Sequence, residues 1–165
     1  AAKSSETSPL VSGMEVSPGC PRFIPAPQDN FLTVYEPGRS GDGLAIMHRG
    51  EITKTARECA LQTGFVTVKF GFAGRILLGP KGQPGILAFP VTVFVTDEKR
   101  TRVTSVKLSV NALVTIEKPI GYFSAVDSVS FKIPEGSRAG DYELLVAFDR
   151  SVPSPVKNKK TNPRS

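Results

Sequence analysis

The sequence predicts an all-β protein, an antiparallel immunoglobulin-like β-sandwich of about seven strands. Apolar side chains recur with a period of two over residues 65–72. This is the spacing of a half-buried strand, because successive side chains leave a strand on opposite faces. The 14 prolines and 15 glycines are typical of short strands joined by tight turns. No segment shows a helical period or an internal repeat, which favours a sandwich of short strands.

Length and charge divide the chain into three parts. Its 165 residues fit one domain, which is expected over residues 20–150. Residues 1–19 are rich in serine, threonine, proline and glycine without periodicity, which predicts a flexible leader or tether. Residues 151–165 are expected to form a basic flexible tail that holds most of the net charge of +6. Because nucleic-acid-binding proteins carry their basic stripe on the folded surface, no nucleic-acid partner is expected.

The first part of the domain predicts an extended entry followed by two strands. Pro21, Pro25 and Pro27 keep the entry non-helical, because each ring fixes its own backbone and restricts the preceding residue. A short strand is expected over residues 31–35 and a long one over residues 44–59.

Two features of the middle strands are specific enough to test. The polar stretch around Gly50 predicts a bulge or a sheet edge at that glycine. The strand over residues 65–77 alternates, whereas the strand over residues 86–96 is apolar on both faces and is expected at the centre of a sheet. Pro90 has no amide hydrogen, so a break in the ladder is expected there.

Three further strands complete the set. They are expected over residues 103–115, 122–133 and 141–149, with a charged turn before the first and a glycine-containing connection before the last. In the last strand, Tyr142 and Phe148 lie on the apolar period, so both are expected in the core.

The two cysteines, Cys20 and Cys59, allow two interpretations. In a cytosolic protein they would most often be unpaired buried thiols, whereas in an exported domain they would form one disulfide. Closing a loop of ~40 residues would stabilise the fold by roughly 4 kcal/mol in the chain-entropy model. Two cysteines and a single histidine cannot complete a four-ligand site without distant carboxylates, so no metal site is expected.

No catalytic constellation is visible in the sequence. His48 is the only histidine, and neither a Gly-x-Ser-x-Gly elbow nor a pair of suitably spaced carboxylates is present. We therefore interpret His48 as a partly exposed strand residue and expect a non-enzymatic protein without a cofactor. The glycine-rich loop over residues 79–85 precedes a strand rather than a helix, so it is interpreted as a turn and not as a phosphate site.

Exposure predicts where a module of this kind makes contact. The strand around residues 48–52 and the loop over residues 79–85 are the expected contact surfaces, since binding residues concentrate on exposed loops and strand edges. The candidate interaction residues are His48, Arg49, Glu51, Lys81 and Gln83.

A series of short motifs follows one order along residues 20–149. The motifs are Cys20-Pro21, Leu32-Thr33, Pro37-Gly38-Arg39, Gly50-Glu51-Ile52, Cys59, Gly79-Pro80, Val93-Phe94-Val95-Thr96-Asp97 and the segment from Ala139 to Phe148. Their order resembles a family of uncharacterised exported bacterial envelope lipoproteins built on a β-sandwich domain. The resemblance implies export, a Cys20–Cys59 disulfide, and a lipid anchor on a cysteine upstream of Ala1. It implies no reaction.

These observations lead to one expected function and one alternative. We expect a non-enzymatic, periplasm-facing structural or protein-interaction module that is part of an envelope lipoprotein. Its partner would be another envelope protein, and its only membrane contact would be the upstream lipid anchor. The alternative is a ligand-binding module for an anionic glycan or a metal ion in the envelope.

Overall fold

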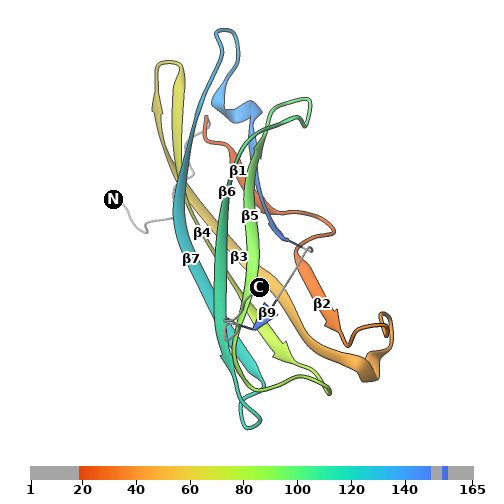
Figure 1. The fold of residues 1–165 in the computed structure, drawn as a ribbon. Coiled ribbons are helices and arrows are strands. Elements are labelled where there is room, and N and C mark those ends of the chain that lie inside the picture. Colours follow the sequence, from red (N-terminus) through yellow and green to blue (C-terminus); the bar gives the residue numbers. More distant parts are fainter. Residues whose placement is uncertain (1–18, 150–153, 156–165) are drawn as a thin grey trace, which may run out of the picture.

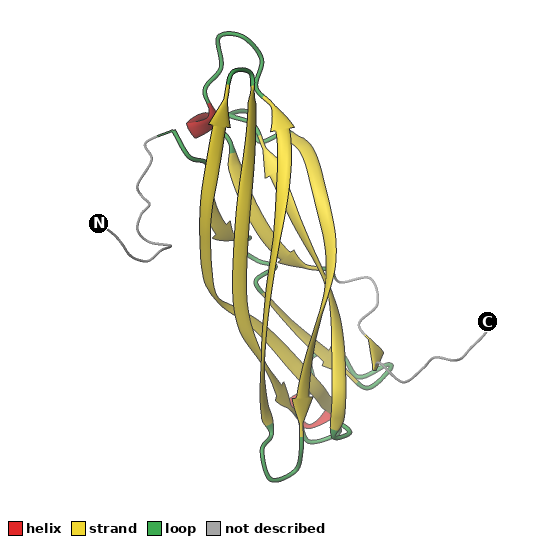
Figure 2. Cartoon of the chain, turned by 90° about the vertical axis from the view of Figure 1, so that its left-hand side faces the viewer, coloured by secondary structure: helices red, strands yellow, loops and turns green. Residues whose placement is uncertain are grey.

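Two β-sheets packed face to face form the molecule (Figures 1 and 2). The computed structural model describes residues 19–149 and 154–155. The five-stranded sheet has the spatial order β1 (Arg22–Pro25), β8 (Glu143–Phe148), β5 (Gly85–Thr96) and β6 (Arg102–Val114), with β9 (Ser154–Pro155) also paired to β5. The four-stranded sheet has the order β2 (Phe31–Tyr35), β3 (Ile46–Gln62), β4 (Phe65–Leu78) and β7 (Ile120–Lys132).

This arrangement is the antiparallel, immunoglobulin-like β-sandwich that the sequence predicts. The seven predicted strands correspond to β2 through β8. The proline-rich entry adds β1, which pairs in parallel with β8 from Arg22↔Glu143 to Pro25↔Val146. Its place at a sheet edge suits a strand that ends in proline, because an edge leaves one side of the strand without ladder partners.

Within residues 19–149, the helical content is confined to two single turns. They are 3-10 turns at Gly43–Ala45 and Ala139–Asp141, and the first is capped by the side chain of Asp42, which accepts a hydrogen bond from the Leu44 amide at 3.0 Å. In the described part of the chain, no helix has the length and apolar character needed to cross a bilayer.

The core lies between the sheets and is built from the inward positions of the alternating strands. Tyr142 and Phe148 are both buried there, as predicted. Phe148 forms the middle of an aromatic row, with its ring centroid 5.6 Å from that of Phe89 and 6.3 Å from that of Phe123. The largest fully buried side chains are Phe70, Phe89, Ile76, Leu144, Val66, Val68, Val91, Val93, Val95, Val114 and Val146.

The expected break at Pro90 is present on one side of β5 alone: the ladder with β8 ends at Val91, whereas β5 itself and its pairing with β6 continue through the proline. The carbonyl of Pro90 accepts a hydrogen bond from the Asp149 amide at 2.9 Å, immediately after β8 ends. In a strand, the amide and carbonyl of one residue point to the same side. The missing amide hydrogen of Pro90 therefore falls where the β8 ladder has already ended, and the pairing with β6 stays intact.

The predicted irregularity in the second strand lies three residues later than expected. Gly50 is in regular register with Ile76, and a β carbon at this glycine would lie 3.0 Å from Cζ of Phe148. Gly50 is thus a site of close inter-sheet packing, and the prediction of a bulge or edge at this residue is wrong. The register shift of β3 falls instead between Ile52 and Lys54, so Thr53 has no Cα partner in the ladder, although its hydroxyl donates a hydrogen bond to the Ala73 carbonyl of β4 at 3.3 Å.

The bulge at Thr53 reverses which residues of β3 face the core. Before it, Gly50 and Ile52 face inward; after it, Thr55, Arg57 and Cys59 lie opposite the buried residues Phe72, Phe70 and Val68 of β4. The alternation continues on each side of Thr53 but changes parity across it, as expected for one inserted residue.

The three inward residues beyond the bulge hold the entry segment to the four-stranded sheet. The Thr55 hydroxyl donates to the Phe23 carbonyl at 3.0 Å, and Nε of Arg57 donates to the Pro21 carbonyl at 2.7 Å. Cys59 forms a disulfide with Cys20, with 6.0 Å between their Cα atoms. The disulfide implied by the family resemblance is therefore confirmed. It links the segment before β1, a strand of the five-stranded sheet, to β3 of the four-stranded sheet.

Replacing both cysteines, as in the Cys20→Ser/Cys59→Ser double variant, should lower the free energy of unfolding by about 4 kcal/mol. The bridge spans a sequence separation of 39 residues, and its loss restores the loop entropy of the unfolded chain. Urea unfolding of the wild type and the double variant measures the difference. Wild type in a reducing agent should reproduce the variant, and equal stability in all three samples would contradict the prediction.

Candidate functional site

The predicted contact residues divide between the core and the surface. His48 is buried, with 4% of its surface exposed, so the expectation that it is a partly exposed surface residue is wrong. It lies on the inward face of β3 because it shares the parity of Gly50 and Ile52. Arg49 and Glu51 have the opposite parity and lie on the outer face of the four-stranded sheet.

His48 is a polar member of the aromatic core. Its ring packs edge-on against Phe89 with 5.6 Å between centroids, and Nδ1 has no hydrogen-bond partner among the described residues. Desolvation on burial lowers the pKa of His48 from its ordinary value of 6.5, more than the backbone of Met47 raises it. The neutral imidazole therefore acts as a packing group.

Arg49 and Glu51 belong to a charged and aromatic surface. The register places Phe31, Glu51, Arg75 and Tyr122 in one row across β2, β3, β4 and β7. The Glu51 carboxylate lies 3.0 Å from Nε of Arg75 and 3.4 Å from Nε of Arg49. The Arg49 guanidinium lies over the Phe31 ring, 5.0 Å from its centroid. We call these five residues the Tyr122 face.

The Tyr122 face adjoins a hollow created by the β3 bulge. The hollow has a volume of about 400 Å³ and is lined by Thr53, Lys54, Ala73, Gly74, Tyr122, Phe123 and Ser124. Tyr122 is 73% exposed at its rim, and Val126 on the same face of β7 is 67% exposed. A large aromatic side chain thus stands beside a concave surface.

Lys81 and Gln83 lie apart from that row, in the turn between β4 and β5. Both side chains are exposed, as predicted, and the turn is held at the start of β3. The Gly79 amide donates to the Met47 carbonyl at 2.8 Å, and the Lys81 amide donates to the Ile46 carbonyl at 2.9 Å. No helix follows this loop, in agreement with its interpretation as an inter-strand turn.

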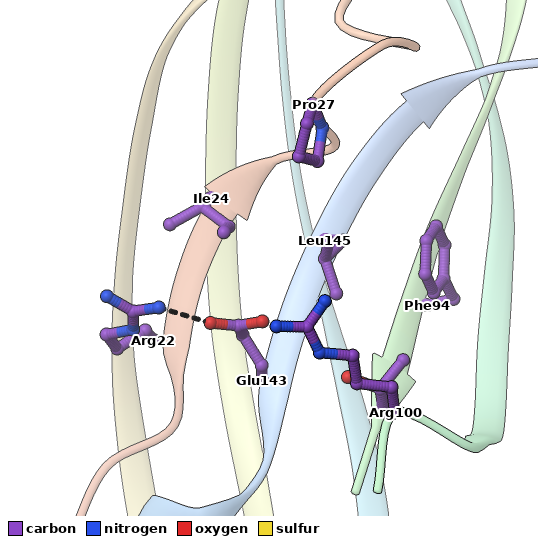
Figure 3. Close-up of a pocket in the computed structure, with 8 residues that line it drawn as sticks. Arg22, Ile24, Pro27, Phe94, Arg100, Glu143 and Leu145 are labelled. Carbon is purple, nitrogen blue, oxygen red and sulfur yellow. Dashed lines mark hydrogen bonds and ion pairs between the residues drawn. The ribbon is translucent and has the colours of Figure 1, made fainter. Parts of the chain in front are cut away.

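A second concave surface lies on the outer face of the five-stranded sheet (Figure 3). This groove of about 370 Å³ is lined by Arg22, Ile24, Pro27, Phe94, Thr96, Arg100, Glu143 and Leu145. The side chains come from β1, β8, β5 and the turns that follow β1 and β5. Arg22 forms an ion pair with Glu143, and the Arg100 guanidinium lies on the other side of that carboxylate (Figure 3).

Arg100 occupies a backbone conformation that favours glycine. Its φ of 65° is the only positive φ of a non-glycine residue in the described ranges. Oδ1 of Asp97 accepts hydrogen bonds at 2.9 Å from the amides of Lys99 and Thr101, and the Arg100 amide donates to the Asp97 carbonyl at 2.9 Å. The turn thus fixes Arg100 in the left-handed region, at a cost of about 1 kcal/mol relative to glycine.

The groove carries more positive than negative charge. Beyond the Arg22–Glu143 pair, the Arg102 guanidinium stacks on the Phe94 ring, 4.0 Å from its centroid. Neither Arg100 nor Arg102 has an ion-pair partner among the described residues. Two cationic groups are therefore available beside an apolar floor.

This groove is not predicted from the sequence, although the sequence holds two signals for it. Phe94 and Leu145 are apolar residues at outward strand positions, where a half-buried strand ordinarily has polar side chains. Arg100 follows Asp97-Glu98-Lys99 at the place where hairpin turns of this kind favour glycine. Cys20 and Cys59, by contrast, are candidate partners from the sequence, and the fold joins them in a disulfide.

Fold and surface together define a disulfide-linked β-sandwich with two distinct concave surfaces on its outer faces. The described residues contain no group of three or more histidine, cysteine or acidic side chains placed to hold a metal ion. The sequence matches no family model, and comparisons with curated proteins and with solved structures give no match.

The buried His48 should make the stability of the protein depend on pH. Because its pKa is lower in the folded state than the ordinary 6.5, the unfolded chain takes up the proton first as the pH falls. The free energy of unfolding should therefore decrease between about pH 7.5 and about pH 5.5. Urea unfolding at both pH values should show a smaller decrease for His48→Leu, and equal decreases in both proteins would contradict the prediction.

Arg100→Gly should raise the free energy of unfolding by about 1 kcal/mol, because glycine adopts the left-handed conformation without a steric cost. Thermal and urea unfolding measure the change. Lys99→Gly is the matched control: it changes the neighbouring residue, whose φ is not positive, and should leave stability unchanged or lower. A loss of stability in Arg100→Gly would show that the side chain contributes more than the strain.

Proposed function

We propose that this chain is a non-enzymatic protein-interaction module of the bacterial cell envelope, part of a lipoprotein, and that it contacts another envelope protein through the Tyr122 face. The observation that carries this proposal is the exposed Tyr122 beside a hollow and in a row with paired arginines. Residues Arg49 and Glu51, predicted as contact residues from the sequence, belong to this face.

The composition of the Tyr122 face supports a protein partner. Tyrosine and arginine are enriched among the residues that dominate binding energy at interfaces. Glu51 holds Arg75 and Arg49 at 3.0 Å and 3.4 Å, so these long side chains are partly ordered before a partner arrives. Prior ordering lowers the entropy lost on association.

The disulfide supports placement in an oxidising compartment. Structural disulfides form and persist in secreted proteins and in the bacterial periplasm, and they are rare in the cytosol. The Cys20–Cys59 bridge is therefore compatible with a domain facing the periplasm. The lipid anchor belongs to the proposal through the family resemblance, on a cysteine upstream of Ala1.

Site-specific photo-crosslinking in the native host tests the interaction surface. A photoreactive residue in place of Tyr122 should give one discrete protein adduct. The matched control is Ser128, which lies on the same face of the same strand, six positions further along, and is exposed. Arg75→Ala should reduce the yield of the Tyr122 adduct, since the row would lose its central cation.

The results separate a specific surface from general proximity. An adduct from Tyr122 that is missing from Ser128 and reduced by Arg75→Ala supports the proposal. Equal adducts from both positions, or none from Tyr122, would contradict it. Mass spectrometry of the same protein, with and without reductant, tests the compartment, because two free thiols and no lipid would remove the argument for export.

A further inference from the structure

We infer that the groove on the outer face of the five-stranded sheet is a second binding site, and that it receives an acidic, extended segment of a partner protein. This groove lies on the opposite outer face from the Tyr122 face and shares none of its residues. The inference therefore does not depend on the proposed function.

The floor of the groove is apolar although it faces outward. Ile24, Phe94 and Leu145 lie on three neighbouring strands, β1, β5 and β8, at positions whose side chains point away from the core. Apolar side chains grouped in one concave outer surface are typical of contact sites. An apolar side chain of a ligand would pack on these three residues and lose its contact with water.

The rim of the groove selects negative charge. Glu143 is paired with Arg22, which leaves the guanidinium groups of Arg100 and Arg102 for a ligand. Guanidinium groups bind carboxylates through two parallel hydrogen bonds, and such charge-assisted bonds are stronger than neutral ones. The groove thus complements a ligand with a carboxylate next to an apolar group.

The backbone at Arg100 is an independent indication of a role for its side chain. The Asp97 turn would be more stable with glycine at position 100, because the φ of 65° strains any other residue there. The arginine directs its guanidinium into the groove beside Glu143 (Figure 3). A residue held at a cost to stability, with its charged end in a concave surface, indicates binding at this point.

The dimensions favour an extended polypeptide over a free small molecule. The groove has a volume of about 370 Å³ and is open to solvent on the sheet surface, whereas small-molecule pockets enclose most of their ligand. It crosses three adjacent strands, and two inter-strand spacings amount to about 10 Å. About three residues of extended chain have this length, enough for an apolar side chain and, two residues along on the same face, an acidic one.

Nuclear magnetic resonance titration of the full chain tests the inference. The probe is the heptapeptide Ser-Glu-Ser-Leu-Ser-Glu-Ser, whose glutamate and leucine side chains share one face in an extended chain, and the matched probe replaces each glutamate by glutamine. The acidic peptide should shift the amide resonances of residues 22–24, 94–96 and 143–145 in a saturable manner. The glutamine peptide should bind at least about tenfold more weakly.

Variants assign the binding to the groove. Arg100→Gly and Arg102→Ala should each weaken binding of the acidic peptide by about tenfold. Arg100→Gly should do so while the protein becomes more stable, so unfolding cannot explain the loss. Lys99→Ala removes the same charge from the neighbouring residue, which does not line the groove, and should change binding less than about twofold.

Four results would overturn the inference. They are no saturable shifts with the acidic peptide, shifts located outside the groove, equal affinity for the glutamine peptide, and equal losses in Lys99→Ala and Arg100→Gly. An oligogalacturonate that binds in the groove where the acidic peptide does not would assign the site to an anionic glycan instead. Shifts in the groove that depend on glutamate, Arg100 and Arg102 support the inference.

Discussion

The single inserted residue at Thr53 is the constraint on which the rest of the structure depends. Without it, Lys54 and Glu58 would face the buried rings and aliphatic groups of β4, and the charges would lose their hydration. With it, those charges stay on the outer face and Cys59 turns inward to reach Cys20. The same irregularity leaves the hollow beside Tyr122, so one backbone feature determines both the covalent bridge and a surface.

The two outer faces use arginine in different ways. On the four-stranded sheet, Glu51 orders Arg49 and Arg75 between two strands. On the five-stranded sheet, Arg102 is ordered by the Phe94 ring and Arg100 by a strained turn. In the first arrangement two arginines share one carboxylate, whereas in the second neither arginine has an acidic partner among the described residues. The two outer faces of this β-sandwich thus differ in chemistry. Neither relies on a metal-binding cluster of histidine, cysteine or acidic side chains, since the described residues contain none.

The sequence predicted those parts of the fold that depend on regular alternation. The strands over residues 65–77 and 86–96 were predicted well because many of their inward positions carry valine or phenylalanine. In β3, by contrast, the inward residues include His48, Gly50, Thr55 and Arg57, so no apolar period marks the bulge. The groove is not predicted because its residues come from three strands and two turns that only the sheet order brings together.

The position of the disulfide determines how the domain bears mechanical load. Cys20 precedes β1, whose short parallel ladder with β8 would otherwise be the first structure to yield to a pull from upstream. The covalent bridge carries such a force past β1 directly to Cys59. From there it loads the long antiparallel ladder between His48 and Gln62 of β3 and its partner β4. A force applied before Cys20 would therefore act on β3, the longest of the described strands, and not on the edge strand β1.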